Sequence, residues 1–476
     1  MRTVDDLIRY SRDKNVQMVD LRFVDLFGAW HHVTLPAQRL DERVFANGVP
    51  FDGSSIPGFK RVQGGDMTLI PDVSTALLDP FWDQRTLGMI CSVAEAGTLE
   101  PFANDPRTVA QRAEALLRSQ SIADYSLWGP EFEFYIFDKI VYQNDINMAY
   151  HRIDSAEADW NSGAEEGQNL GGKIPRKGGY HAMPPLDNLY NLRAEMARQI
   201  EEAGIPVRYH HHEVGGPGQS EIEINLLPLE KAADATMLVK YITKMVAREA
   251  GKTVTYMPKP LYNEAGSGMH FHQLLMRGGK SLFFEAGQYA NLSKLGRQYV
   301  GGILRHGRAL LALTNPSTNS FKRLVPGFEA PVSLCYGLAN RSAAIRIPKY
   351  VNNELENRIE FRPPDGTCNV YLAVAAQLMA GIDGILNDLD AEREGFGPVD
   401  CNIFDLPAAE RDHIGKMPTS LREAMMALGD DHAFLLRGGV FTEEMIRIII
   451  DAKMRHDYDE VRNRPHPYEM SLYFDC

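Results

Sequence analysis

Four short segments of the chain alternate between charged and apolar residues with a period of two. In GPEFEFYIF, Glu131 and Glu133 alternate with two phenylalanines. Three further segments share this alternation, and their charged positions are Glu221 and Glu223 in SEIEINL, His270 and His272 in GMHFHQL, and Arg358, Glu360 and Arg362 in NRIEFRPP. Successive side chains of a β-strand point to opposite faces. Each segment is therefore predicted to be a strand with one charged face and one apolar face.

Longer segments have the apolar spacing of amphipathic helices. Helices are predicted over residues 188–204 and 229–251, where apolar side chains recur every three or four positions. A further helix is predicted over 107–119. It follows Asp105 and Pro106, which are typical of a helix N-cap and of the first helical turn.

A domain boundary is predicted near residue 104. The preceding segment AEAGTLEPFAND is rich in residues that favour turns, and the strand-like runs QMVDLRFVD and AWHHVTLP lie before it. Residues 1–103 are thus expected to form a small domain and residues 104–476 a larger one. In the larger part, residues 142–180 and 314–331 are expected to be long irregular loops. Such loops are either functional or tolerated surface insertions.

Composition narrows the class of protein. Of the 476 residues, 44% are hydrophobic and 24% charged, as in ordinary globular proteins. The net charge of −13 argues against a nucleic-acid binder, which would carry a basic surface. Five widely spaced cysteines without a CxxC pair favour free thiols in a reducing cytoplasm. No signal peptide and no membrane span is expected, because no apolar run approaches about 18 residues.

The charged faces of the four predicted strands carry only Glu, His and Arg. One such strand alone is readily explained as a polar face turned to water. If the strands are neighbours, their carboxylates repel one another unless cations neutralise them. Carboxylates with a single imidazole suit Mg²⁺ or Mn²⁺ better than structural zinc. In HHHEV, Glu213 is expected to join this group, with at most one of the histidines at 210–212.

Arginines are numerous near the same segments. Arg341 and Arg346 lie in NRSAAIRIP, and Arg323 lies in KRLVPG. Bound metal ions beside several guanidinium groups suit the binding of a polyphosphate and the transfer of a phosphoryl group. The chain has neither a GxxxxGK[ST] loop nor the HRD and DFG motifs of protein kinases. Phosphate chemistry is therefore predicted on another scaffold.

Taken together, the motifs closely resemble bacterial type I glutamine synthetases over nearly the whole chain. They occur in the order FDGSSIPGF, GPEFEFY, KGGY, HHHEVGGPGQSEI, MPKPL, GSGMHFH, NPSTNSFKRLVPGFEAP, NRSAAIRIP and RIEFRPPDG. The resemblance implies an α+β fold with a small β-grasp-like N-terminal domain and a catalytic domain built on a curved antiparallel sheet. It also implies ATP-dependent ligation of ammonia to glutamate through γ-glutamyl phosphate. Two or more Mg²⁺ or Mn²⁺ ions would serve each active site, and a cytoplasmic dodecamer would form these sites between subunits.

The resemblance also implies a role for individual residues. One metal ion would bind Glu133, Glu213 and Glu221, and the other would bind Glu131, His270 and Glu360. ATP would be bound by Arg208, His272, Leu274, Arg341, Arg346 and Arg358. Glutamate would be bound by Ala265, Gly266, Arg323, Glu329 and Arg362. The residues expected to act in catalysis are Arg341, Glu329 on a covering loop, and Asp52 contributed by a neighbouring subunit, with Ser55 in the same loop as Asp52.

The chain departs from the commonest pattern of that family at a few positions. Ala265 stands where many members have Asn, Arg208 where many have an acidic residue, and Leu226 where an aromatic residue is frequent. Phe404 occupies the position of a tyrosine that is adenylylated in many type I enzymes, so this modification is predicted to be absent. Two alternatives remain at the level of sequence: a glutamate–amine ligase, and a noncatalytic assembly protein of the same family.

Overall fold

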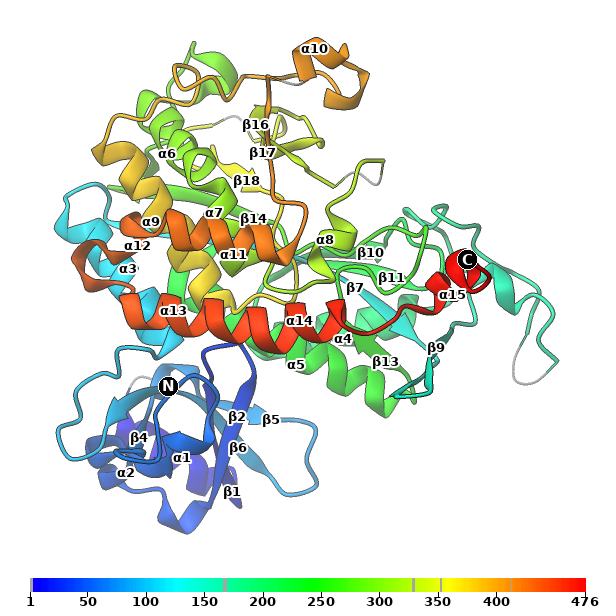
Figure 1. The fold of residues 1–476 in the computed structure, drawn as a ribbon. Coiled ribbons are helices and arrows are strands. Elements are labelled where there is room, and N and C mark those ends of the chain that lie inside the picture. Colours follow the sequence, from blue (N-terminus) through cyan, green and yellow to red (C-terminus); the bar gives the residue numbers. More distant parts are fainter. Residues whose placement is uncertain (1–2, 166–168, 328–329, 352, 412) are drawn as a thin grey trace.

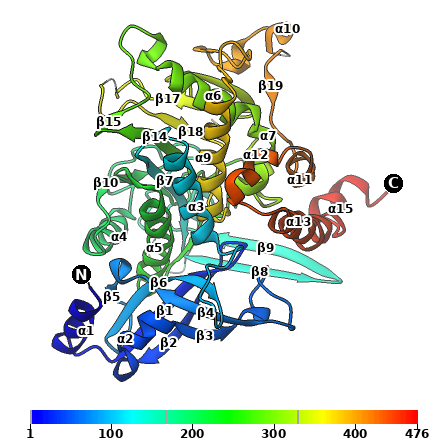
Figure 2. The same ribbon diagram turned by 90° about the vertical axis from the view of Figure 1, so that its left-hand side faces the viewer.

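The computed structural model describes residues 3–165, 169–327, 330–351, 353–411 and 413–476, which form two domains (Figure 1). The N-terminal domain lies against one side of the larger domain in both Figure 1 and Figure 2. The last strand of the small domain ends at Glu95, and the first helix of the larger one begins at Pro106. The predicted boundary at residues 103 and 104 falls between these two points.

A six-stranded sheet is the basis of the N-terminal domain. Its order is β2 (Trp30–Pro36), β1 (Met18–Val24), β6 (Thr86–Glu95), β4 (Asp66–Pro71) and β3 (Val49–Asp52), and β5 (Leu77–Asp79) also pairs with β6. Strands β1 and β6 run parallel, and the other pairs are antiparallel. Leu7 of α1 (Val4–Asp13) and Val44 of α2 (Glu42–Asn47) complete the apolar core on this sheet.

The larger domain is built on an eleven-stranded sheet that contains all four strands predicted from the alternating pattern. Its order is β10 (Val207–His212), β11 (Gln219–Ile224), β7 (Tyr125–Phe137), β14 (Phe271–Arg277), β18 (Ile359–Phe361), β17 (Ala343–Ile347), β16 (Ser333–Leu338) and β19 (Gly415–Lys416). Three short strands pair at its sides, namely β12 (Leu227–Pro228), β13 (Thr253–Thr255) and β15 (Lys280–Ser281). The expectation of an antiparallel sheet is correct except at one place, because β16 and β17 run parallel.

Helices cover the apolar face of this sheet. They are α3 (Pro106–Ser119), α4 (Tyr190–Glu202), α5 (Leu229–Glu249), α6 (Lys294–Arg305), α7 (Gly307–Thr314) and α9 (Val370–Leu386). The helix α9 is buried along nearly its whole length, as expected for its almost continuous apolar sequence. The phenylalanines between the charged positions, such as Phe132, Phe134 and Phe271, are fully buried in the same core. The opposite face of these strands is left free for the charged residues.

The predicted start of α3 is confirmed. The side chain of Asp105 accepts a hydrogen bond from the backbone N–H of Thr108, and Pro106 occupies the first turn. Proline has no N–H to donate, so it costs little at this position, where the N–H groups have no partner within the helix.

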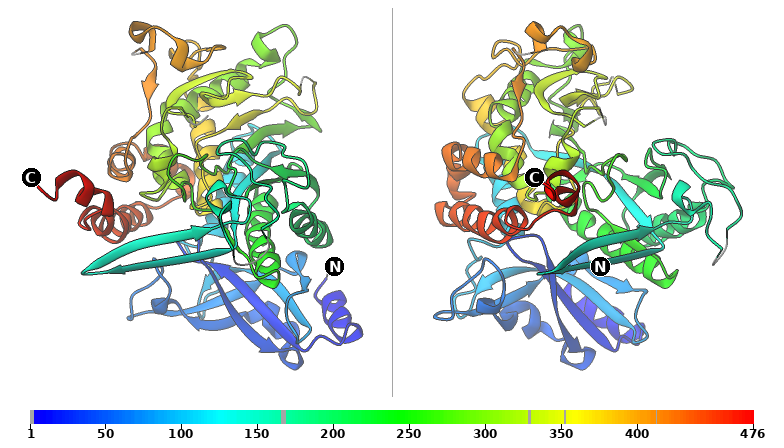
Figure 3. Two further views of the ribbon diagram at one scale, coloured as in Figure 1. Left: turned by 90° about the vertical axis from the view of Figure 1, so that its right-hand side faces the viewer. Right: turned by 45° about the vertical axis from the view of Figure 1, so that its right-hand side comes forward.

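Residues 142–180 are less irregular than expected. The strands β8 (Lys139–Asp145) and β9 (Met148–Asp154) form a hairpin that projects from the body of the protein (Figure 3). The sequence of this pair shows no alternation of polar and apolar residues, since both of its faces are largely exposed. The loop 314–331 contains the short helix α8 (Ser320–Arg323).

The C-terminal part of the chain adds further short helices. They are α10 (Ala408–Arg411), α11 (Leu421–Asp430), α12 (Ala433–Leu436), α13 (Glu443–Ala452), α14 (Asp459–Arg462) and α15 (Pro467–Tyr473). The helix α15 lies at the end of an extended arm (Figure 3). None of the helices in the described part of the chain has both the length and the apolar character needed to cross a bilayer.

Candidate active site

Strand pairing brings the predicted charged faces together. Glu221 of β11 lies opposite Glu133 of β7, and Glu223 lies opposite Glu131. On the other side of β7, the backbone N–H of Glu131 donates to the carbonyl of His270, and β14 in turn pairs with β18, which carries Glu360. Four segments far apart in the sequence thus present their charged side chains on one surface. We call Glu131, Glu133, Glu213, Glu221, His270 and Glu360 the carboxylate floor.

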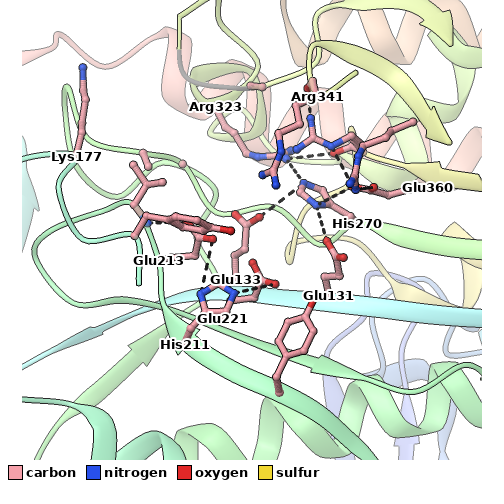
Figure 4. A pocket seen from close by; sticks show the side chains of 18 of the residues that line it. Glu131, Glu133, Lys177, His211, Glu213, Glu221, His270, Arg323, Arg341 and Glu360 are labelled. Atoms are coloured by element: carbon pink, nitrogen blue, oxygen red, sulfur yellow. Dashed lines mark hydrogen bonds and ion pairs between the residues drawn. The ribbon is translucent and has the colours of Figure 1, made fainter. Parts of the chain in front are cut away.

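A cavity of about 550 Å³ opens above the carboxylate floor (Figure 4). Besides the floor, it is lined by Lys177, Tyr180, Tyr209, His211, Val214, Ala265, Gly266, Arg323, Gly327, Ala330, Arg341, Arg346, Tyr350 and Arg362. Most of these residues are charged or aromatic. The cavity is therefore suited to a charged ligand and not to an apolar one.

One group of possible metal ligands consists of Glu131, His270 and Glu360, all buried. The Nδ1 atom of His270 lies 2.9 Å from Oε2 of Glu131 and 3.6 Å from Oε1 of Glu360. Burial opposes ionisation of Glu131, but His272 and His270 hold its pKa well below the usual value. The side chain is therefore a carboxylate, the form that binds a metal ion. This group is the set that the sequence predicted for the second ion.

A second group of possible ligands consists of His211, Glu213 and Glu221. A third, Glu131, Glu223 and His272, shares Glu131 with the first group, and its other two members do not line the cavity. The Nε2 atom of His211 lies 3.6 Å from Oε1 of Glu221. Burial and the charges of Glu133 and Glu221 raise the pKa of Glu213 well above its usual value. Burial and the charges of Glu131 and Glu133 do the same for Glu221. Carboxylates crowded in this way fit a divalent cation, whose charge offsets their mutual repulsion.

The predicted first set differs from this group in one member. Glu133 lies between the two groups, with Oε1 3.7 Å from Nε2 of His270 and Oε2 accepting a hydrogen bond from the N–H of Gly268. His211 takes its place beside Glu213 and Glu221. The sequence allowed one histidine of HHHEV to reach the site, but could not identify it. The next histidine, His212, is buried with Nε2 3.2 Å from Glu157.

Arginines surround Glu360 and His270. Both Arg346 and Arg362 form ion pairs with Glu360. Arg323 is buried: it donates to the carbonyl oxygens of Pro363 and Arg362, and its Nη2 lies 3.2 Å from Nε2 of His270. In Figure 4 Arg323 and Arg341 lie on the same side of the cavity as His270 and Glu360.

The predicted nucleotide ligands are not all at the cavity. Arg346 and Arg341 line it. Nε of Arg358 lies 3.4 Å from Nδ1 of His272, and neither of these two side chains lines the cavity. Arg208 forms an ion pair with Glu223. The structure does not bring Leu274 to the cavity, because this side chain is 1% exposed and packs in the apolar core.

The backbone at the predicted glutamate subsite is closely packed. The carbonyl of Ala265 accepts a hydrogen bond from the hydroxyl of Tyr135, and the carbonyl of Gly266 accepts one from Gln219. A Cβ atom at Gly266 would lie 2.7 Å from the carbonyl oxygen of Pro258 and from Cγ of Arg323. Only glycine therefore fits this wall of the cavity.

Of the two residues predicted to bind and deprotonate ammonium, one lies apart from the cavity and the other lies outside the described residues. Asp52 is exposed on the N-terminal domain, where the hydroxyls of Ser54 and Ser55 donate to its carboxylate at 2.6 and 2.7 Å. These hydrogen bonds hold the pKa of Asp52 below its usual value. Glu329 lies outside the described residues. Asp52 could act at a cavity of this kind only if another subunit brought it there.

Four aromatic or basic residues of the cavity were missed as individual candidates: Lys177, Tyr180, Tyr209 and Tyr350. Lys177 and Tyr180 are part of the KGGY motif and Tyr209 precedes HHHEV, so these three had a signal in the sequence. Tyr350 follows RIPK in a segment with no regular pattern. Its position can be seen only in the folded chain.

The sheet, its carboxylate floor and the adjoining arginines define a class: metal-dependent enzymes that transfer a phosphoryl group without a P-loop. The family model "Glutamine synthetase, catalytic domain" matches residues 103–473, and "Glutamine synthetase, beta-Grasp domain" matches residues 15–96. The chain belongs to the glutamine synthetase family.

Individual relatives match over their full length. The glutamine synthetase of Frankia alni is 48% identical over 99% of both chains, and that of Nostoc sp. is 46% identical over 100% of both. Among solved structures, the Plasmodium falciparum glutamine synthetase has a TM-score of 0.88 at 28% identity and covers 99% of both chains. A GmaS–ADP complex has a TM-score of 0.81 at 25% identity, covering 99% of this chain and all of that one.

Proposed function

We propose that this protein is a glutamate–ammonia ligase, which forms glutamine from glutamate and ammonia with hydrolysis of ATP to ADP and phosphate. The observation that carries the proposal is the carboxylate floor, where two groups of possible metal ligands lie beside arginines in one cavity. The full-length match to glutamine synthetases supports the same reaction. A noncatalytic family member would have no need to keep so many buried carboxylates together, since each costs free energy to desolvate.

The first step activates the glutamate side chain. A side-chain oxygen of glutamate attacks the γ-phosphorus of ATP, a new P–O bond forms, and the bond to the bridging oxygen breaks to release ADP. Arg341 and Arg346 line the cavity and would stabilise the charge on the phosphoryl oxygens. Arg323 and Arg362 would bind the carboxylates of glutamate, with the backbone near Ala265 and Gly266 beside them.

Divalent cations have an evident place in this scheme. Glu131, His270 and Glu360 would hold one, and Glu213 and Glu221 the other, with His211 or Glu133 completing the second group. Bound Mg²⁺ or Mn²⁺ would neutralise the phosphates and align them for displacement. A donor set of carboxylates with an imidazole fits these ions better than it fits structural zinc.

The second step consumes the activated acyl group. The nitrogen of ammonia attacks the acyl carbon of γ-glutamyl phosphate, a C–N bond forms, and the C–O bond to phosphate breaks. The nitrogen then loses one proton, which the released phosphate can take. Ammonium in water is not a nucleophile, so a carboxylate must take a proton from it. We assign this task to Asp52 of a neighbouring subunit and Glu329, the two residues that the family resemblance singled out. Exclusion of water protects the acyl phosphate from hydrolysis.

A homo-oligomer follows from this assignment, and the family resemblance implies a dodecamer in the cytoplasm. Two exposed features support association. The β8–β9 hairpin carries the exposed side chains of Ile140, Tyr142 and Ile146, and α15 carries those of Tyr468, Met470 and Leu472. Apolar side chains grouped on projecting segments usually mark contacts with another chain.

The experiment that tests the proposal compares acceptors. Purified protein is incubated with glutamate, ATP and Mg²⁺ or Mn²⁺, and with either ammonium or a panel of amines that includes methylamine and a diamine. We expect glutamine and ADP in equal amounts, with ammonium as the preferred acceptor. Preference for an amine would make the protein a glutamate–amine ligase. Absence of ADP formation with every acceptor would exclude both ligase functions.

A further inference from the structure

Tyr350 lies where three arginine side chains converge. The guanidinium carbons of Arg208, Arg346 and Arg358 are 5.6, 5.7 and 5.7 Å from the centre of its ring. The tyrosine lies in a turn after β17, lines the cavity and is 55% exposed. The three arginines come from β10, from β17 and from the segment before β18, so the ring joins three parts of the sheet.

Each of these arginines is tied to a different charged or polar residue at the base of the cavity. Arg208 forms an ion pair with Glu223, whose backbone lies opposite Glu131. Arg346 forms an ion pair with Glu360. Nε of Arg358 lies 3.4 Å from Nδ1 of His272. The guanidinium groups are therefore attached to the carboxylate floor or its immediate neighbours at one end, and to the ring of Tyr350 at the other.

Three guanidinium groups this close together repel one another. The face of an aromatic ring carries negative charge density, and a cation within about 6 Å of the ring centre is attracted to it. A rigid ring also limits the rotamers of the flexible arginine side chains that pack against it. Without the ring, repulsion and rotamer entropy would both favour movement of the three guanidinium groups away from one another.

We infer that Tyr350 is a positioning residue for the polyphosphate of ATP, acting through Arg346, which lines the cavity, and through Arg208 and Arg358 beside it. This inference rests on the proposed function, since it takes the cavity to be the ATP site. Because its neighbours are cations, the ring holds groups that attract an anion. The ring therefore contributes to binding of the phosphates and does not stack on the adenine base.

The test separates the phosphates from the base. Binding of ATP, AMP and inorganic tripolyphosphate, each with Mg²⁺, is measured by calorimetry for the wild-type protein and for Tyr350→Ala and Tyr350→Phe. Tyr350→Ala is expected to weaken ATP and tripolyphosphate about tenfold, as the loss of two or three cation–π contacts implies. AMP binding should change less than about twofold, and Tyr350→Phe should restore the ring and the affinity. Tyr262→Ala, at a tyrosine that is 98% exposed, is the matched control.

Steady-state kinetics supply an independent readout. In Tyr350→Ala the KM for ATP should rise by a similar factor, whereas the KM for glutamate should stay constant and kcat should change less than about threefold. Equal weakening of AMP and ATP would show that the ring stacks on the base, and would overturn the inference. So would unchanged tripolyphosphate binding in Tyr350→Ala, or a loss in Tyr350→Phe as large as in Tyr350→Ala. If folded wild-type protein bound no ATP, the proposed function itself would be wrong.

Discussion

Glu360 is the side chain that the metal ligands and the arginines of the cavity share. It lies 3.6 Å from Nδ1 of His270 and forms ion pairs with Arg346 and Arg362. These two guanidinium groups and His272 hold its pKa below the usual value, against burial and the charge of Glu131. Glu360 is therefore ionised and able both to bind a cation and to orient two arginines.

Replacement of Glu360 by alanine should remove one metal ligand and release both arginines. We expect Mn²⁺ to bind at least about 100-fold more weakly, since even loss of an outer-shell partner of a metal ligand can cost 10–100-fold. Phosphoryl transfer should fall in parallel, while far-UV circular dichroism stays unchanged. The measurement is Mn²⁺ titration by calorimetry, with the exposed Glu356→Gln as control. Normal turnover of Glu360→Ala at limiting metal would contradict the proposed ligation.

Phe404 lacks the single atom, a hydroxyl oxygen, that regulation by adenylylation would need at this position. Adenylylation needs a hydroxyl oxygen to attack the α-phosphorus of ATP, and a phenyl ring has none. The half-buried Phe404 lies in a short 3₁₀ turn, η6 (Ile403–Asp405), whose preceding residue Asn402 caps it through its side chain. Tyrosine is similar to phenylalanine in size, so Phe404→Tyr should keep this turn.

We expect no AMP on the wild-type segment 401–410 after incubation with a bacterial adenylyltransferase and ATP, as judged by mass spectrometry of its peptides. Phe404→Tyr tests whether the missing hydroxyl alone is responsible. AMP on another residue of this segment of the wild-type protein, together with loss of activity, would show that the prediction is wrong.

At the scale of elements, β7 explains why both groups of ligands lie at one cavity. It is the long strand between β11 and β14, so its alternate residues Glu131 and Glu133 face neighbours on both sides. A shift in register by one residue would turn both glutamates into the apolar core and expose Phe132 and Phe134. Burial of the phenylalanines thus fixes the orientation of the glutamates.

A buried histidine connects α6 and α7 to α9 and α11. His306, between α6 and α7, lies 3.1 Å from Asp383 of α9 and 2.8 Å from Asp431 at the end of α11, and its ring stacks on Phe434. Burial alone would lower its pKa, but the two aspartates raise it above the usual value. Arg437, which also contacts Asp383, is the nearby opposing charge.

Because the pKa of His306 is raised in the folded state, the charged histidine contributes stability that is complete below its unfolded pKa of about 6.5. This contribution decreases as the pH rises through the folded pKa. His306→Asn should therefore be most destabilising near pH 6, and the difference from the wild type should shrink toward pH 9. Urea unfolding at several pH values measures this directly. A constant or growing difference would show that stacking on Phe434, and not charge, is the main contribution.

At the scale of the whole molecule, the position of Asp52 makes a prediction about assembly. It lies on the N-terminal domain, exposed, and does not line the cavity of its own chain. If it acts on ammonium, it must do so in the cavity of a neighbour. Activity would then require an oligomer, and sedimentation of a fully active monomer would exclude this arrangement.

Mixed assemblies give the sharpest test. Asp52→Asn should raise the ammonium requirement strongly while leaving ATP and glutamate binding largely unchanged, and Glu360→Ala should be inactive. When the two variants are unfolded together and reassembled at a 1:1 ratio, about a quarter of the sites would pair an intact Asp52 with an intact Glu360 if subunits mix at random. We expect activity at low ammonium to reappear in the mixture only. No recovery in verified mixed oligomers would place Asp52 outside the neighbouring site.

Short segments of the sequence by themselves determined the faces of the strands, the start of a helix and the family. The period of two determined which residues share a face, because side-chain direction in a strand depends only on neighbouring positions. Asp105 and Pro106 determined the start of α3 through hydrogen bonds within one turn. The motifs and their order determined the family. The exposed β8–β9 hairpin escaped this reasoning, because a strand without a buried face has no alternation to detect.

Only the tertiary structure decided which distant residues meet. It selected His211 among three consecutive histidines, placed Leu274 in the core, and paired Arg208 with Glu223. It also brought three arginines around Tyr350. These contacts depend on the order and register of strands that are far apart along the chain. Non-local pairing is set by the packing of the whole apolar core, and no short stretch of sequence encodes it.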